Sequence, residues 1–116
     1  MSERVALHEP RLDGNEWRYL KDCLDSGWVS TAGRYVELFE QGVAEYTGAS
    51  FAISCINGST ALQLSLSLAG VRSGDEVIVP SLTFIASINA VHHNGASPIF
   101  MDADDYCNID PNKCIE

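Results

Sequence analysis

Basic residues and long apolar runs are scarce in this 116-residue chain. It has 7 Lys and Arg against 16 Asp and Glu, which gives a formal net charge of −9 at pH 7. Phosphate backbones are bound by basic surfaces, so this balance argues against a nucleic-acid partner. No apolar run reaches the length of a bilayer span, and the opening residues "MSERVALHEP" carry charges where a signal peptide needs its apolar region. We therefore expect a cytoplasmic protein with no membrane partner.

Patterns that bind metals or form disulfides are also missing. Counted from Asp102, the acid-rich stretch "MDADDYCNID" (101–110) places Cys107 and Lys113 where a calcium loop needs Gly and Glu. The cysteines show no CxxC spacing, so neither a zinc site nor a disulfide framework is predicted. These cysteines are Cys23, Cys55, Cys107 and Cys114. We predict no metal site.

The few cations are unevenly distributed along the chain. Most lie in the first 34 residues, and from residue 35 onward only Arg72 and Lys113 remain. An anionic ligand held by the later part of the chain would therefore depend largely on backbone N–H groups or on a partner chain.

The first 48 residues have the pattern of two helices joined by a loop. In "LDGNEWRYLKDCLDSG" an apolar stripe and a capping residue at Asp13 predict a helix from Asp13 to Asp25, with Gly27 as its stop. In "RYVELFEQGVAEYTG" (34–48) apolar residues at helical spacing predict a second helix. The loop between them is "GWVSTAG" (27–33). Residues 1–48 are thus an N-terminal helical segment.

Residues 49–116 have the pattern of an α/β domain. Three short apolar runs, "FAISCI" (51–56), "GDEVIVP" (74–80) and "SPIFMD" (97–102), are typical of strands in a parallel sheet. The segment 83–95 between the last two suits a helix. Strands that alternate with helix-length segments indicate βαβ units. The predicted architecture is a parallel βαβαβ arrangement preceded by two helices.

The stretch "SCINGSTALQLSLSLAG" is ambiguous between strand and helix. Its leucines alternate with polar residues, which is the period of a half-buried strand. Parallel strands, however, need a long crossover between them, and Leu and Ala are strong helix formers. We therefore predict a helix that starts at Ser59 and is buried between the sheet and another layer.

The start of this helix is a candidate phosphate-binding site. Gly58, Ser59 and Thr60 would present free N–H groups and hydroxyls at the carboxyl edge of the sheet. The structural alternative is that Ser59 is only an N-cap. Phe84 follows the next strand at the same edge, where its ring could stack on a flat ligand. The alternative for Phe84 is an ordinary core aromatic.

Three segments together resemble the DegT/DnrJ/EryC1/StrS family. They are "GWVSTAGRYVELFE", "NGSTALQLSLSLAGVRSGDEVIVPSLTFIASINAVHHNGASPIFMDAD" and "NID". Members of this family are pyridoxal-phosphate (PLP) sugar aminotransferases of the aspartate aminotransferase fold, and they act on nucleotide-linked keto-sugars. The opening "LDGNEW…LDSGWVS" is most similar to members in surface-glycan or legionaminic-acid-type pathways. The resemblance implies the N-terminal part of the large domain of a type I PLP-dependent transferase.

The resemblance also implies roles for particular residues. It places the PLP phosphate on Gly58, Ser59 and Thr60 and stacks Phe84 on the cofactor ring. It makes Trp28 and Ser30 contacts of the nucleotide-sugar substrate. It further implies glutamate as the amino donor and an active site at a homodimer interface.

The catalytic residue that the resemblance implies does not fall within this chain. The Schiff-base lysine of the family and the acidic partner of the pyridine nitrogen would lie beyond residue 116. Neither Lys21 nor Lys113 matches the lysine motif, so we expect this chain alone not to catalyse transamination. Some relatives carry histidine in place of that lysine and dehydrate the sugar. In the resembled fold, strand 51–56 is also separated from the next two strands by strands contributed later in the chain.

The sequence is also compatible with two other functions. One is a small flavodoxin-like phosphate-binding or receiver module, which usually needs about five strands, whereas three are predicted here. The other is a relative without catalytic activity that serves as a structural or regulatory partner, which the missing lysine would permit.

Overall fold

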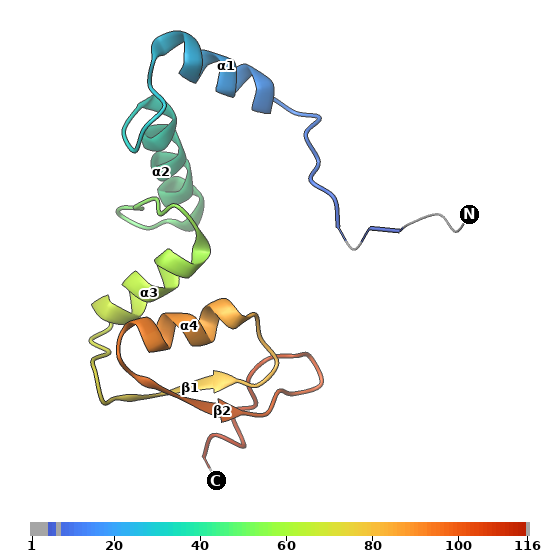
Figure 1. The fold of residues 1–116 in the computed structure, drawn as a ribbon, viewed down its shortest axis with the longest axis vertical. Helices are drawn as coiled ribbons and strands as arrows, with labels where there is room; N and C mark the ends of the chain where they lie inside the picture. The colour runs from blue at the N-terminus through green and yellow to red at the C-terminus, as the bar shows by residue number, and fades with distance from the viewer. Residues whose placement is uncertain (1–4, 7, 116) are drawn as a thin grey trace. The chain divides into compact units, whose positions relative to one another are not determined.

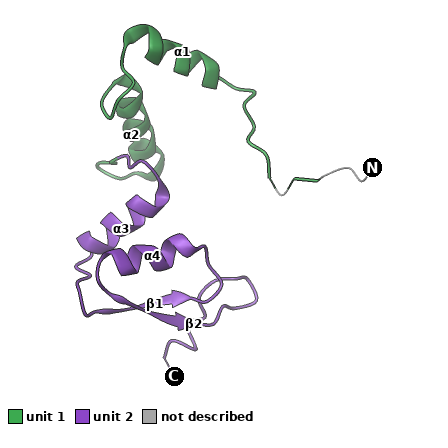
Figure 2. Ribbon diagram, viewed as in Figure 1, with its two compact units in different colours: residues 1–53 green, residues 54–116 purple. Residues whose placement is uncertain are grey.

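The computed structural model describes residues 5–6 and 8–115, and these form two compact units. Unit 1 comprises residues 1–53 and unit 2 comprises residues 54–116 (Figure 2). Segment 49–53 therefore groups with the N-terminal helices by its contacts. The division into domains 1–48 and 49–116 stays a prediction.

Unit 1 contains the two predicted helices, α1 (Glu16–Ser26) and α2 (Arg34–Thr47) (Figure 1). The prediction that Asp13 caps α1 is wrong, because the helix begins at Glu16 after Asn15. The Asp13 carboxylate instead pairs with the Arg11 guanidinium at 2.7 Å. Glu16 accepts a hydrogen bond from the Gly14 N–H at 2.9 Å, which organises the chain before the helix. The stop predicted at Gly27 is confirmed, since this residue is left-handed with φ 74°.

Side chains of α1 and α2 meet at Tyr35. Its phenol donates a hydrogen bond to the Asp22 carboxylate at 2.8 Å, and its ring lies 5.0 Å from that of Tyr19. The Arg34 guanidinium lies 3.9 Å from the same carboxylate. The hydrogen bond to Asp22, followed by desolvation, raises the pKa of Tyr35 above its ordinary value of 10.0.

Because of this hydrogen bond, we expect the stability of unit 1 to depend on pH. The neutral phenol is the donor, so the contribution of the bond is complete below the unfolded pKa and is lost as pH rises through the raised pKa. In a spectrophotometric titration of tyrosinate, the component that is missing from the Tyr35→Phe variant identifies Tyr35, and it should ionise above pH 10.0 in the wild type. Asp22→Asn should move that component to lower pH. A Tyr35 component that Asp22→Asn leaves unmoved would contradict the contact.

Unit 2 is built around one parallel βαβ element. Strands β1 (Glu76–Pro80) and β2 (Ser97–Met101) are paired in parallel, with Ile78 opposite Ile99. Helix α4 (Ile85–His93) forms the crossover and covers one face of the pair (Figure 1). The buried core residues are Val79, Ala90, Val91 and Ala96, which are at most 5% exposed. The predicted α/β class is confirmed for this unit.

The segment with alternating leucines is helix α3 (Gly58–Leu68), as predicted. Its predicted position between the sheet and another layer is wrong, because α4 lies between α3 and the strands (Figure 1). Leucines at alternate positions point to different sides of a helix. Leu66 alone among them packs against the core, whereas Leu68 is 80% exposed.

The predicted strand 51–56 does not form. Within the described chain the sheet consists of β1 and β2 only, so this segment has no ladder partner. Phe51, Ile53 and Ile56 are each more than three-quarters exposed. A strand needs hydrogen bonds from a neighbour, and the resemblance places the neighbours of this segment later in the chain. Over the residues that the structure describes, the order is therefore three helices followed by βαβ, instead of two helices followed by βαβαβ.

The acid-rich stretch after β2 is a hydrogen-bonded turn. The Asp104 carboxylate accepts bonds from the Tyr106 and Asn108 N–H groups, both at 2.9 Å. Asp102 pairs with the Lys113 ammonium at 3.2 Å. In the described ranges, no group of three or more His, Cys, Asp or Glu side chains could hold a metal ion. None of the described helices is long and apolar enough to cross a membrane.

Candidate functional site

The first turn of α3 is organised by Asn57. This residue is extended, with φ −162° and ψ 170°, and its Oδ1 accepts a hydrogen bond from the Thr60 N–H at 2.9 Å. Its backbone carbonyl accepts from the Ala61 N–H at 3.1 Å. The reading of Ser59 as the N-cap is therefore wrong, and the helix starts one residue earlier than predicted. Asn is among the preferred N-cap residues, so the sequence did carry a signal for it.

The cap leaves two backbone donors at the start of the helix. The N–H groups of Gly58 and Ser59 have no carbonyl one helical turn earlier to bond, and no backbone hydrogen bond from them occurs within the described residues. Both residues are exposed. A Cβ built on Gly58 meets no atom within 4 Å, so a ligand can approach this backbone.

The electrostatics of this turn favour an anion. The positive end of the α3 dipole lies here, and the first turn contains no acidic residue. Two unpartnered N–H groups, the Ser59 hydroxyl and an open approach fit a phosphate group. The only cations of unit 2 are Arg72 and Lys113, and Lys113 is already paired with Asp102. Backbone donors would therefore provide most of the binding.

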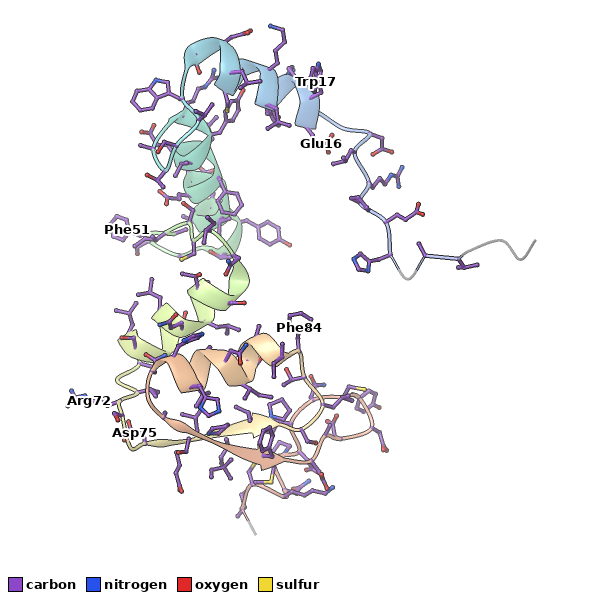
Figure 3. All side chains as sticks on the ribbon, viewed as in Figure 1. Glu16, Trp17, Phe51, Arg72, Asp75 and Phe84 are labelled. Atoms are coloured by element: carbon purple, nitrogen blue, oxygen red, sulfur yellow. The ribbon has the colours of Figure 1, made fainter. Side chains whose placement is uncertain are left out.

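Phe84 lies at the start of α4, directly before Ile85 (Figure 3). Its side chain is 79% exposed, which contradicts the alternative of a core aromatic. α4 is also the helix against which α3 packs. The phosphate-sized turn and the exposed ring thus belong to neighbouring helices of one unit. The stacking role of Phe84 stays a prediction.

Trp28 and Ser30 belong to unit 1 and line the same cavity, which has a volume of about 660 Å³. Trp17, Leu20 and other mainly apolar residues of α1 and α2 complete its lining. Gly33 allows the loop to pack against Trp28. A Cβ added at Gly33 would lie 3.4 Å from Trp28 Cβ, and the φ of Gly33 is +141°, which side-chain-bearing residues rarely adopt. The structure brings these two candidate residues together, and their role in substrate binding stays a prediction.

The DegT/DnrJ/EryC1/StrS aminotransferase family model matches residues 10–116. The chain belongs to this family. This membership excludes the flavodoxin-like module.

GDP-perosamine synthase of Caulobacter vibrioides is 50% identical over 101 residues, which cover 87% of this chain and 27% of that protein. GDP-perosamine synthase of Vibrio cholerae is 46% identical over 100 residues, which cover 86% of this chain and 27% of that protein. The chain thus spans about a quarter of the length of these curated relatives.

Solved structures show the same fold. The chain superposes on Spr1654 from Streptococcus pneumoniae, in its PLP form, with a TM-score of 0.86 and 30% identity, covering 97% of this chain and 29% of that one. The chain also superposes on GDP-4-keto-6-deoxy-D-mannose-3-dehydratase from E. coli with bound hydrated PLP. The TM-score is 0.80 and the identity is 27%, and the superposition covers 92% of this chain and 29% of that one. The predicted fold, part of a type I PLP-dependent transferase domain, is confirmed.

Proposed function

We propose that this chain is the portion of a PLP-dependent nucleotide-sugar aminotransferase that binds the cofactor phosphate. The observation that carries the proposal is the first turn of α3, where the Gly58 and Ser59 N–H groups bond to no backbone carbonyl of the described residues and no acidic residue occurs. Family membership supports the identity of the anion, because solved relatives contain PLP. When bound, PLP supplies an electron sink for chemistry at the amino-bearing carbon.

The residues of this chain hold the cofactor rather than react with it. The Gly58 and Ser59 N–H groups and the Ser59 and Thr60 hydroxyls bind the phosphate, and Phe84 covers one face of the ring. The lysines of the chain are Lys21 and Lys113, and both are in surface ion pairs, with Asp25 and Asp102 respectively. Neither lysine matches the lysine motif of the family, so in this proposal the reactive amine is supplied by residues outside this chain, in a longer polypeptide that we call the complete enzyme.

The substrate that we propose is a GDP-linked keto-sugar with glutamate as the amino donor. Support comes from the GDP-perosamine synthases, which are 46–50% identical to this chain. Within unit 1, the cavity with Trp28 and Ser30 has an aromatic wall and a hydroxyl, groups that suit the mixed apolar and polar surface of a sugar. The complete enzyme is a cytoplasmic homodimer in this proposal.

A sugar dehydratase is the second candidate function. It is favoured by the superposition on GDP-4-keto-6-deoxy-D-mannose-3-dehydratase. The two functions differ in the residue that stands at the Schiff-base position of the complete enzyme, which is lysine for amino transfer and histidine for dehydration. This chain contributes the same phosphate turn in both cases.

One assay separates these functions. The complete enzyme is incubated with PLP, nitrogen-15-labelled glutamate and GDP-4-keto-6-deoxymannose, and the sugar nucleotide is analysed by mass spectrometry. We expect the label in the sugar product. Loss of water from the sugar without gain of label would establish the dehydratase. A sugar that stays unchanged, with no PLP absorbance on the protein, would refute the proposed function.

A further inference from the structure

The side chain of Asn94 connects α4 to α3. Asn94 follows α4 as its C-cap residue and is half-buried. Its Nδ2 donates a hydrogen bond to the Ala90 carbonyl at 2.8 Å and a second to the Gln63 carbonyl of α3 at 3.1 Å. Gln63 and Asn94 are 31 residues apart in sequence. Each N–H of this amide therefore donates a hydrogen bond, one to a carbonyl of α4 and one to a carbonyl of α3.

The end of α4 explains why an amide is needed here. The Asn94 backbone N–H bonds to Val91 and His92 carbonyls and so leaves the Ala90 carbonyl without its regular helical donor. Ala90 is 2% exposed, so water has little access to this part of the helix. An unpaired buried carbonyl is costly, and the side-chain amide satisfies it. The remaining N–H of the amide then reaches α3.

The position of α3 depends on few other contacts. Among the described elements, α3 packs extensively only against α4. None of its residues is fully buried, and Leu66 alone packs against the core. Gln63 follows Thr60 by less than one helical turn. The Asn94 hydrogen bond therefore restrains α3 close to the turn that presents the Gly58 and Ser59 N–H groups.

We propose that Asn94 is a positioning residue for the cofactor phosphate. It holds the first turn of α3 in a fixed place relative to α4, the helix that begins after Phe84. This inference rests on the proposed function, because it takes the anion on that turn to be the phosphate of PLP. Asn94 touches neither the cofactor nor the substrate in this proposal, and it acts through α3.

The test compares PLP with pyridoxal, which lacks the phosphate, in the complete apoenzyme. Asn94→Asp removes both donors and places a carboxylate against two carbonyls, and Asn94→Ala is a milder variant that leaves room for water. Asn89→Asp is the matched control, since Asn89 is exposed on the same helix. We expect the Kd for PLP to rise about tenfold in both Asn94 variants, the Kd for pyridoxal to change less than about twofold, and the control to match wild type.

A double variant tests whether Asn94 affects PLP binding through the first turn of α3. Because Asn94 acts through the phosphate turn, Asn94→Ala and Ser59→Ala together should weaken PLP binding by less than the product of the two single effects. An equal loss of affinity for PLP and pyridoxal, or no loss for either, would overturn the role of Asn94. A wild-type enzyme that binds PLP no better than pyridoxal would instead refute the phosphate turn itself, and this inference with it.

Discussion

Ser59→Asp is expected to weaken PLP binding by the complete enzyme by at least about a hundredfold while α3 stays folded. A carboxylate at the second position of a helix interacts favourably with the helix dipole. The same carboxylate would lie against a dianionic phosphate, where like charges a few ångströms apart repel by about 4 kcal/mol at the effective dielectric constant of a protein surface. The variant therefore separates the stability of the helix from its binding of an anion. Fluorescence titration with PLP measures the effect.

Two controls accompany this variant. Ser67→Asp places the same charge near the other end of the same helix, and it should leave the Kd for PLP within about twofold of wild type. Pyridoxal should bind Ser59→Asp almost as well as wild type, since it has no phosphate to repel. If Ser59→Asp bound PLP normally, Ser59 would be an ordinary helix residue and the site would lie elsewhere.

The 116-residue chain by itself is expected to retain no PLP through dialysis and to show no transamination above the rate of free PLP. Covalent attachment needs an unprotonated amine at the cofactor aldehyde. Lys21 and Lys113 do not match the lysine motif of the family, and both side chains are in exposed ion pairs, with Asp25 and Asp102 respectively. The absorbance of the dialysed protein near the cofactor bands gives the measurement, and Lys21→Ala with Lys113→Ala serves as the comparison.

A stoichiometric cofactor band on the isolated chain would contradict this expectation. If the band then disappeared in the Lys113→Ala variant, the catalytic lysine would belong to this chain, and the acid-rich turn after β2 would be part of the active site. If it persisted without either lysine, the absorbance would come from non-covalent binding to the turn at Gly58 and Ser59.

The sequence predicted helices better than it predicted how they pack. Helix α3 was predicted correctly against the alternating leucines, because a parallel crossover and Leu and Ala propensities both favour a helix. Its place outside α4 could not be predicted, since a helix with leucines on several sides has no single face to bury. Strand 51–56 was predicted from its apolar residues, but a strand depends on a neighbour that the described chain does not supply.

The candidate site was predictable where its signals are local. Gly58, Ser59 and Thr60 follow each other in sequence, and a glycine before hydroxyl residues at a helix start is a pattern with a physical meaning. Asn57 was not predicted as the cap, because Ser59 is an equally favourable N-cap residue type and lies only two residues later in the sequence. The Asn94 bridge to Gln63 left no local signal, since it depends on how two helices pack.

We propose above all that the phosphate of PLP binds to the first turn of α3. A crystal structure of the complete holoenzyme tests it most directly. We expect phosphate oxygens within about 3 Å of the backbone nitrogens of Gly58 and Ser59, with the Asn57 side chain still bonded to the Thr60 N–H. A holoenzyme in which the phosphate is bound by other residues, and these two nitrogens face only solvent, would contradict it.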